Sequence, residues 1–101
     1  MVNVVVLAPE CQCYDRLTAM LDEVVEHMVA VRLYSISYNN TDAMVTRYSK
    51  ERNYDMNQYR SDTEAIDECH VLAVVWHESE HYYDVIQKAK NGGAIILSYI
   101  I

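Results

Sequence analysis

Five consecutive residues, His77-Glu78-Ser79-Glu80-His81, form an H-E-x-x-H pattern. On a helix this spacing places two imidazoles on one face, where they can hold zinc while the glutamate acts as general base. Here the pattern directly follows an apolar run, so we expect His77 in a loop or cap, and no histidine follows His81 as a third ligand. Two alternatives stay open: a metal site of His77 and His81 serving a metal-dependent hydrolase, and a polar loop in which Ser79 caps the next helix.

The three cysteines, at positions 11, 13 and 69, do not have the spacing of a disulfide framework. We expect free thiols in a reducing cytoplasm, with Cys69 acting as a small buried hydrophobe ahead of a core strand. No apolar run approaches the length of a membrane span. The sequence therefore predicts a cytoplasmic protein without membrane attachment.

Fifteen acidic residues against eight basic ones give the chain a net charge of −7. This charge opposes non-specific binding to nucleic acid or anionic lipid, because both depend on attraction to phosphate. It suits a protein that docks on a basic surface. Nine tyrosines and no phenylalanine also favour an interaction surface, since tyrosine buries much area at little entropic cost.

Strands and helices are expected to alternate along the whole chain. The hydrophobic pattern predicts strands over 2–7, 31–37, 54–59, 71–76 and 94–101. Helices are predicted over 17–28, 43–52, 61–68 and 80–90, the last with Tyr83, Val85, Ile86 and Ala89 as inner residues. Asp15 is expected to cap the first helix, residues 39–42 to form a turn before the second, and Asn91-Gly92-Gly93 to end the last.

Such alternation implies right-handed crossovers between parallel strands, with helices on both faces of the sheet. We predict one three-layer, Rossmann-like α/β domain over residues 1–101, with a five-stranded, mostly parallel sheet in the order 3-2-1-4-5. The third helix is too short to cover its share of the sheet. We therefore expect a thinly covered apolar flank, which suits a homodimer.

The segment Ser35–Asn53 resembles the second strand and helix of small SLOG-superfamily proteins of the YspA-like branch. In that family the strand leads into Gly-Gly-Ala-Arg-Gly-Ala-Asp and a helix with Arg-Tyr-Ala-Lys-Glu-Arg-Asn. Leu72–Trp76 and Asp84–Lys90 are similar to a later strand and the last helix of the family. The resemblance implies a Rossmann-like scaffold that binds nucleotides or nucleotide-derived signals, with an enzyme branch that cleaves nucleoside monophosphates. The matching positions of the second helix are Asp42, Arg47, Tyr48, Lys50, Glu51, Arg52 and Asn53.

The sequence departs from the family pattern at the carboxyl ends of the strands, where open α/β sheets bind ligands. Ala8-Pro9-Glu10 stands in place of Gly-x-Arg, and the glycines of the later loops are replaced as well. A backbone that approaches phosphate closely needs glycine, yet the chain's two glycines follow the last helix. Glu78 and Glu80 would join Glu10 at one rim, where a like-charge contact at ~4 Å costs on the order of 1–4 kcal/mol. We interpret the site as degenerate.

The sequence thus predicts a non-enzymatic protein-interaction module that needs no cofactor. Small, glycine-poor versions of host-like domains are typical of phage accessory proteins, so we expect a counter-defence inhibitor of a host factor in the host cytoplasm. The alternative is a nucleotide or nucleotide-signal binding protein, a sensor or sponge. The predicted partner- or ligand-binding residues are Pro9, Glu10, Tyr14, Arg16, Tyr38, Asn39, Asn40, Asp42, Trp76, His77, Glu78, Glu80 and Tyr82.

Overall fold

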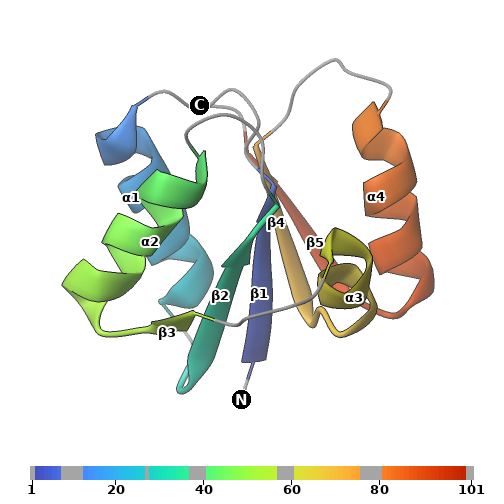
Figure 1. The fold of residues 1–101 in the computed structure, drawn as a ribbon, viewed down its shortest axis with the longest axis horizontal. Coiled ribbons are helices and arrows are strands. Elements are labelled where there is room, and N and C mark those ends of the chain that lie inside the picture. The colour runs from blue at the N-terminus through green and yellow to red at the C-terminus, as the bar shows by residue number, and fades with distance from the viewer. Residues whose placement is uncertain are drawn as a thin grey trace.

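Five parallel strands form a single sheet in the order β3-β2-β1-β4-β5 (Figure 1). The structure is a computed structural model that describes residues 2–7, 13–26, 28–36, 41–56, 61–75 and 81–99. Its strands are β1 (Val2–Leu7), β2 (Val31–Ser35), β3 (Asp55–Met56), β4 (Val71–Val75) and β5 (Ile95–Tyr99). The predicted fold class and strand order are confirmed.

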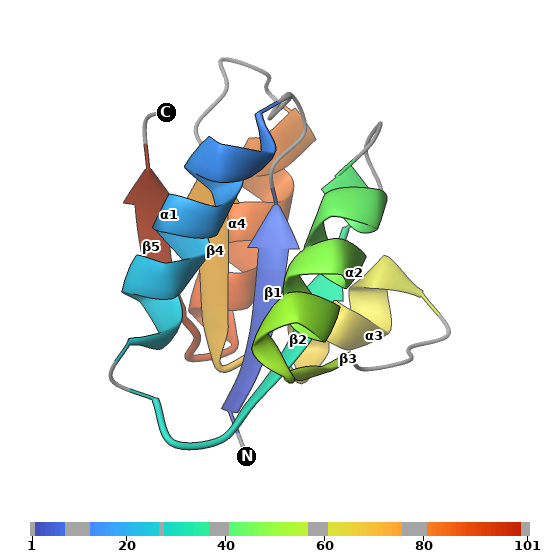
Figure 2. The same cartoon turned by 90° about the vertical axis from the view of Figure 1, so that its left-hand side faces the viewer.

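Two helices cover each face of the sheet (Figures 1 and 2). On one face lie α1 (Tyr14–Val25) and α2 (Thr41–Arg52), and on the other lie α3 (Asp62–Asp67) and α4 (His81–Asn91). This division follows from right-handed crossovers, because the chain moves outward from β1 to β3 and then returns across β1 to β4 and β5. Within the described part of the chain, no helix is long and apolar enough to cross a bilayer.

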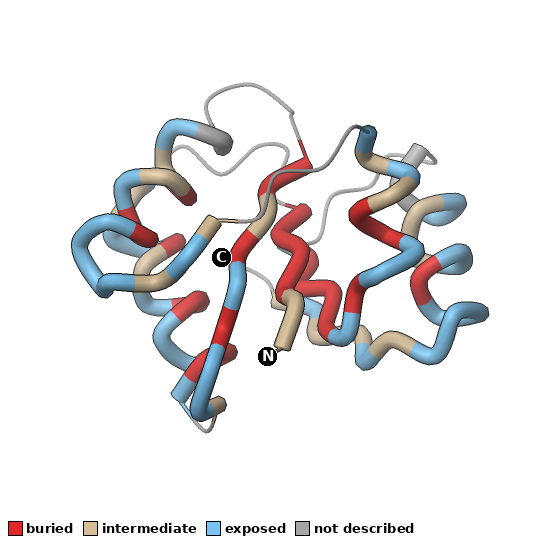
Figure 3. Tube along the Cα trace, turned by 60° about the horizontal axis from the view of Figure 1, so that its bottom comes forward, coloured by how far each residue is buried: buried red, intermediate tan, exposed pale blue. Residues whose placement is uncertain are grey.

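The central strand β1 is buried on both faces, and Figure 3 shows buried residues concentrated along the middle of the sheet. Val4 and Val6 face the α1–α2 layer, whereas Val5 and Leu7 face the α3–α4 layer. All four are fully buried, which explains why the strand has a continuous apolar run rather than an alternating pattern.

Several predicted element boundaries are wrong. The described part of the third strand is only Asp55–Met56, because the Tyr54 N–H is used to close α2 through the Ser49 carbonyl. β2 ends at Ser35, and α1 ends at Val25 rather than Met28. The residues expected as a turn at 41–42 are the first residues of α2.

Two side-chain predictions are also wrong. Asp15 does not precede α1 but lies in its first turn, and the residue at the cap position is Cys13, whose side chain makes no capping hydrogen bond. Tyr83 is 53% exposed, although the sequence predicts an inner position. The inner stripe of α4 consists of Val85, Ile86 and Ala89, and Tyr83 lies to one side of it.

The ends of α4 and α2 share one geometry, the Schellman motif. In α4 the Ala94 N–H donates to the Ala89 carbonyl at 3.0 Å and the Gly93 N–H donates to the Lys90 carbonyl at 3.1 Å. Gly93 has a φ of 90°, so the predicted glycine stop is confirmed. In α2, Asn53 takes the corresponding position with a φ of 58°.

We expect Asn53→Ala to destabilise the protein by about 1 kcal/mol, because the left-handed conformation brings a Cβ atom too close to the following carbonyl and alanine lacks asparagine's local hydrogen bonds. Asn53→Gly is the matched control, and it should keep or slightly raise stability because glycine has no Cβ atom. Urea unfolding of both variants measures the difference. Equal midpoints for alanine and glycine would contradict the assignment.

Candidate functional site

The carboxyl edge of the sheet is the place where the predicted site residues begin. β1 and β2 end side by side, with Val6 paired to Ser35, and β4 ends next to β1, with Leu7 paired to Val74. The segments that follow these three strands therefore start from one edge, as predicted. Most of the predicted residues themselves lie outside the described part of the chain: Pro9, Glu10, Tyr38, Asn39, Asn40, Trp76, His77, Glu78 and Glu80, and also the side chains of Asp42, His81 and Tyr82.

Tyr14 is described, and it links two helices. Its hydroxyl donates a hydrogen bond to Glu51 Oε2 at 2.8 Å, and Arg47 lies over its ring with Cζ 4.0 Å from the ring centroid. Arg47 Nε also donates to Glu51 Oε1 at 3.0 Å. Tyr14, predicted as a partner-binding residue, therefore has its ring and its hydroxyl engaged by α2. Arg16, in the same turn of α1, is exposed.

A second link between α1 and α2 lies deeper and joins the third turn of α1 to neighbouring residues of α2. Tyr48 is fully buried, and its hydroxyl donates to Asp22 Oδ1 at 2.7 Å. Arg52 donates to both oxygens of Asp22 at 3.2 and 3.1 Å and lies over the Tyr48 ring. The Tyr54 ring stacks against the Tyr48 ring, and the two ring centroids are 6.1 Å apart.

These contacts shift the pKa values of the groups in predictable directions. The hydrogen bonds from Arg52 and Tyr48 hold the pKa of Asp22 below its usual value. Hydrogen bonds from Tyr14 and Arg47 likewise lower the pKa of Glu51. Burial, followed by the Asp22 carboxylate, raises the pKa of Tyr48. Both carboxylates are therefore ionised at neutral pH, and neither is tuned for proton transfer.

Asp22→Asn should remove a pH-dependent part of the stability. Because the folded pKa of Asp22 is depressed, its contribution is present above the unfolded pKa near 3.8 and is lost as pH falls through the folded value. The carboxylate is 47% exposed, so we expect only about 0.5–1 kcal/mol at pH 7 after solvent screening.

Urea unfolding at pH 7 and pH 2 measures this effect. The gap between wild type and Asp22→Asn should close at the lower pH. The matched control is Asp55→Asn, the same chemical change at an exposed residue of β3 that makes no ion pair with another described residue. A gap that persists at pH 2 would show that the carboxylate's charge is not the cause.

The helix residues that carry the SLOG resemblance thus have structural roles. Arg47 and Glu51 hold the first turn of α1, Tyr48 and Arg52 hold its third turn, and Asn53 ends α2. Sequence reasoning missed these pairings, although the i,i+4 spacing of Arg47 and Glu51 was a visible signal. Of the other two matching residues, Lys50 is exposed and the side chain of Asp42 lies outside the described part.

The described residues hold neither a metal-binding cluster nor a disulfide, and Cys13 is an exposed thiol, as predicted. Among these residues no group of three His, Cys, Asp or Glu side chains can hold a metal ion. The H-E-x-x-H pattern remains a prediction, because its side chains lie outside the described part. Burial raises the pKa of the Cys69 thiol to about 11, and the residue is 7% exposed, which confirms its prediction as a small buried hydrophobe and not a nucleophile.

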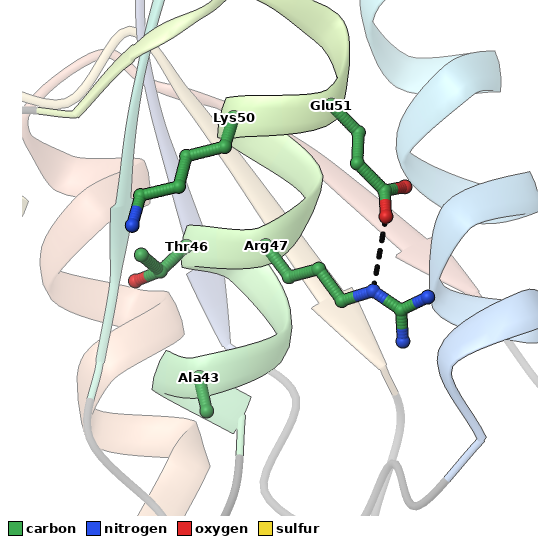
Figure 4. Close-up of a pocket in the computed structure, with 5 residues that line it drawn as sticks. All are labelled: Ala43, Thr46, Arg47, Lys50 and Glu51. Atoms are coloured by element: carbon green, nitrogen blue, oxygen red, sulfur yellow. Dashed lines mark hydrogen bonds and ion pairs between the residues drawn. The ribbon is translucent and has the colours of Figure 1, made fainter.

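One hollow of about 620 Å³ lies along the outer face of α2. Its five described lining residues, Ala43, Thr46, Arg47, Lys50 and Glu51, all belong to that helix (Figure 4). Figure 4 shows Thr46 and Lys50 pointing to one side, while Arg47 and Glu51 form their ion pair on the other. A single helix face supplies no opposing wall, so we assign no ligand to it.

The fold and the described contacts define a Rossmann-like α/β domain whose α1–α2 layer is fastened by two tyrosine–carboxylate–arginine clusters. Comparison with protein-family models, with curated proteins and with solved structures gives no match. The SLOG resemblance therefore stays a prediction, and function must be argued from the chain's own residues.

Proposed function

We propose that this protein is a non-enzymatic interaction module that binds a partner protein through the carboxyl edge of its sheet. On this proposal it is an accessory inhibitor, of the counter-defence kind that phages encode, which presents carboxylates to a basic groove of a host factor. The supporting surface is the one where Rossmann-like domains bind ligands. Here that surface is acidic rather than phosphate-binding.

The distribution of positive charge carries the proposal. Helices in this fold run antiparallel to the strands, so the basic residues in the last turns of α2 and α4 lie toward the amino edge of the sheet. Arg47 lies nearer the carboxyl edge, but its guanidinium group forms an ion pair with Glu51. Of the described basic residues, Arg16 is the one exposed in a helix turn that begins at the carboxyl edge. A phosphate would find little positive charge there, whereas a basic protein surface would meet the chain's excess of carboxylates.

Two described acidic residues lie at the carboxyl edge itself. Asp15 and Asp84 lie in the first turns of α1 and α4, both at the carboxyl edge. Acidic side chains in a first helical turn are stabilised by the helix dipole, so they need no partner within the domain. Together with Glu10, Glu78 and Glu80 in the adjoining segments, they make this edge suited to cationic partners.

Affinity capture tests the proposal with a matched charge control. The protein is immobilised and exposed to bacterial lysate, and retained proteins are identified by mass spectrometry. Glu10→Lys/Glu78→Lys should lose the partner, while Asp55→Lys/Glu68→Lys, the same charge change near the starts of β3 and β4, should keep it. Equal capture by the two double variants, or no retained protein at all, would overturn the proposal.

Two ligand tests distinguish the alternatives. A nucleotide that raises the melting temperature of the wild type, with the shift lost in Asp42→Ala, would replace the proposal by a nucleotide-binding role. Stoichiometric zinc that is lost in His77→Ala/His81→Ala would replace it by a metal-dependent one.

A further inference from the structure

The two edges of the sheet are protected to different degrees. β3 is two residues long in the described part and begins with the exposed Asp55, and a short strand with a charge is a usual protection against edge pairing. β5 is five residues long, Ile95-Ile96-Leu97-Ser98-Tyr99, without charge or proline. It pairs with β4 on one side, and no described strand lies on the other.

The side chains of β5 are incompletely covered. Ile95 is 61% exposed, and Leu97 and Tyr99 are half-buried at the margin of the α1–α2 core. These three alternate residues lie on one face of the strand. A long, uncharged edge with apolar side chains offers both unpaired backbone groups and a surface to bury.

We propose that two copies of this chain associate through their β5 strands, paired antiparallel about a two-fold axis, so that two five-stranded sheets become one continuous sheet. An edge strand is self-complementary in this arrangement, because each copy offers the same row of donors and acceptors to the other. If the two-fold axis passes beside Leu97, Ile95 of one copy lies opposite Tyr99 of the other. The apolar side chains of the two strands then form one continuous apolar surface. The proposal does not rest on the proposed function, because the backbone groups that would pair belong to the lateral edge of the sheet, along β5.

Charged residues beside β5 favour a second copy of this chain as the partner that pairs with its free edge. Arg16 and Glu23 are exposed and are separated by seven residues of α1, so they share one side of the helix. Asp22, on the other flank of the buried stripe of α1, contacts Tyr48 and Arg52 of α2. The side with Arg16 and Glu23 is therefore turned away from α2, toward the β5 edge of the sheet (Figure 2). A two-fold axis sets the two α1 helices antiparallel, which turns Arg16 of each copy toward Glu23 of the other.

The opposite face of the sheet has a similar pairing. Lys88 of α4 contacts Asp67 of α3 at 3.5 Å, so its side of α4 points away from β5. Tyr83 and Lys90 lie on the other side of the helix, seven residues apart, and both are exposed. The same axis brings the ammonium group of Lys90 toward the Tyr83 ring of the second copy, a favourable cation–π geometry.

Sedimentation velocity across a concentration series tests the proposal. The wild type should sediment as a dimer at about 100 μM, and Ile95→Lys should raise the dimer dissociation constant at least tenfold. Val29→Lys is the matched control, because Val29 is fully exposed two residues before β2, a strand that β1 and β4 separate from β5, and it should leave the dimer intact. A monomeric wild type, or equal dimerisation of both variants, would overturn the proposal.

A charge swap tests the two-fold arrangement without touching the strand. Arg16→Glu and Glu23→Arg should each weaken the dimer, and the double variant should regain most of the lost affinity, because the pair is restored across the axis. A double variant weaker than either single variant would exclude this geometry. Circular dichroism confirms folding of each variant, and lysate capture by Ile95→Lys shows separately whether partner binding survives in the monomer.

Discussion

Tyr48→Ala is expected to destabilise the protein by about 3–5 kcal/mol, as for other large buried aromatic side chains. Tyr48 is fully buried between α1 and α2. Its removal leaves a cavity beneath Arg52 and takes from Asp22 Oδ1 one of its two hydrogen bonds. Domains of this size are stable by roughly 5–15 kcal/mol, so the variant should lose a large part of the total. Urea or thermal unfolding measures the loss.

Tyr48→Phe separates the hydroxyl from the ring. It keeps the packing and removes only the hydrogen bond to Asp22, so we expect a cost of about 1 kcal/mol. A second control is Tyr54→Ala, whose half-buried ring should cost less than the fully buried one. If Tyr48→Phe proved as damaging as Tyr48→Ala, the hydrogen bond rather than packing would hold the helices together.

The strand order could be predicted from the sequence because the hydrophobic runs differ in kind. The continuous apolar runs at 2–7 and 71–75 mark strands buried on both faces, and these are the adjacent central strands β1 and β4. The alternating run that begins at Val31 marks β2, whose exposed Arg32 lies between two buried residues. Right-handed crossovers then leave few ways to arrange the rest.

Helix ends and helix-to-helix contacts could not be predicted in the same way. Whether Asn53 ends α2 in the left-handed conformation depends on hydrogen bonds from the following residues, and this is what removed Tyr54 from the third strand. The link from Tyr14 to Glu51 joins residues 37 positions apart, and no local pattern specifies such a pair. Long-range side-chain pairing is set by how the helices pack, which periodicity alone does not determine.

The resemblance to SLOG proteins has a different meaning once these contacts are known. The Arg-Tyr-x-Lys-Glu-Arg-Asn pattern of α2 was the most specific part of that resemblance, yet Tyr48 and Arg52 bind Asp22 of α1, and Asn53 closes the helix. A motif of this kind is a requirement for joining two helices. The contacts of these residues therefore give no argument for nucleotide binding, and the SLOG resemblance stays a prediction.

Leu72→Ala is expected to cost about 2–5 kcal/mol, because the residue is fully buried in the layer under α3 and α4. Leu72 lies in β4 between Val5 of β1 and Ile96 of β5. The short helix α3 covers this region with Ala65 and Ile66, so little apolar mass is available to refill the cavity. The cost should therefore fall in the upper half of the range.

The matched control for Leu72→Ala is a truncation of an exposed apolar residue. Val29 is fully exposed, and Val29→Ala should change stability by no more than about 0.5 kcal/mol. Urea unfolding with a common slope for the three proteins gives the comparison. A cost for Leu72→Ala as small as that for Val29→Ala would mean that the α3–α4 layer is not packed against the sheet as described. Because β5 is held through the same strand, β4, such a result would also weaken the case for pairing through its free edge.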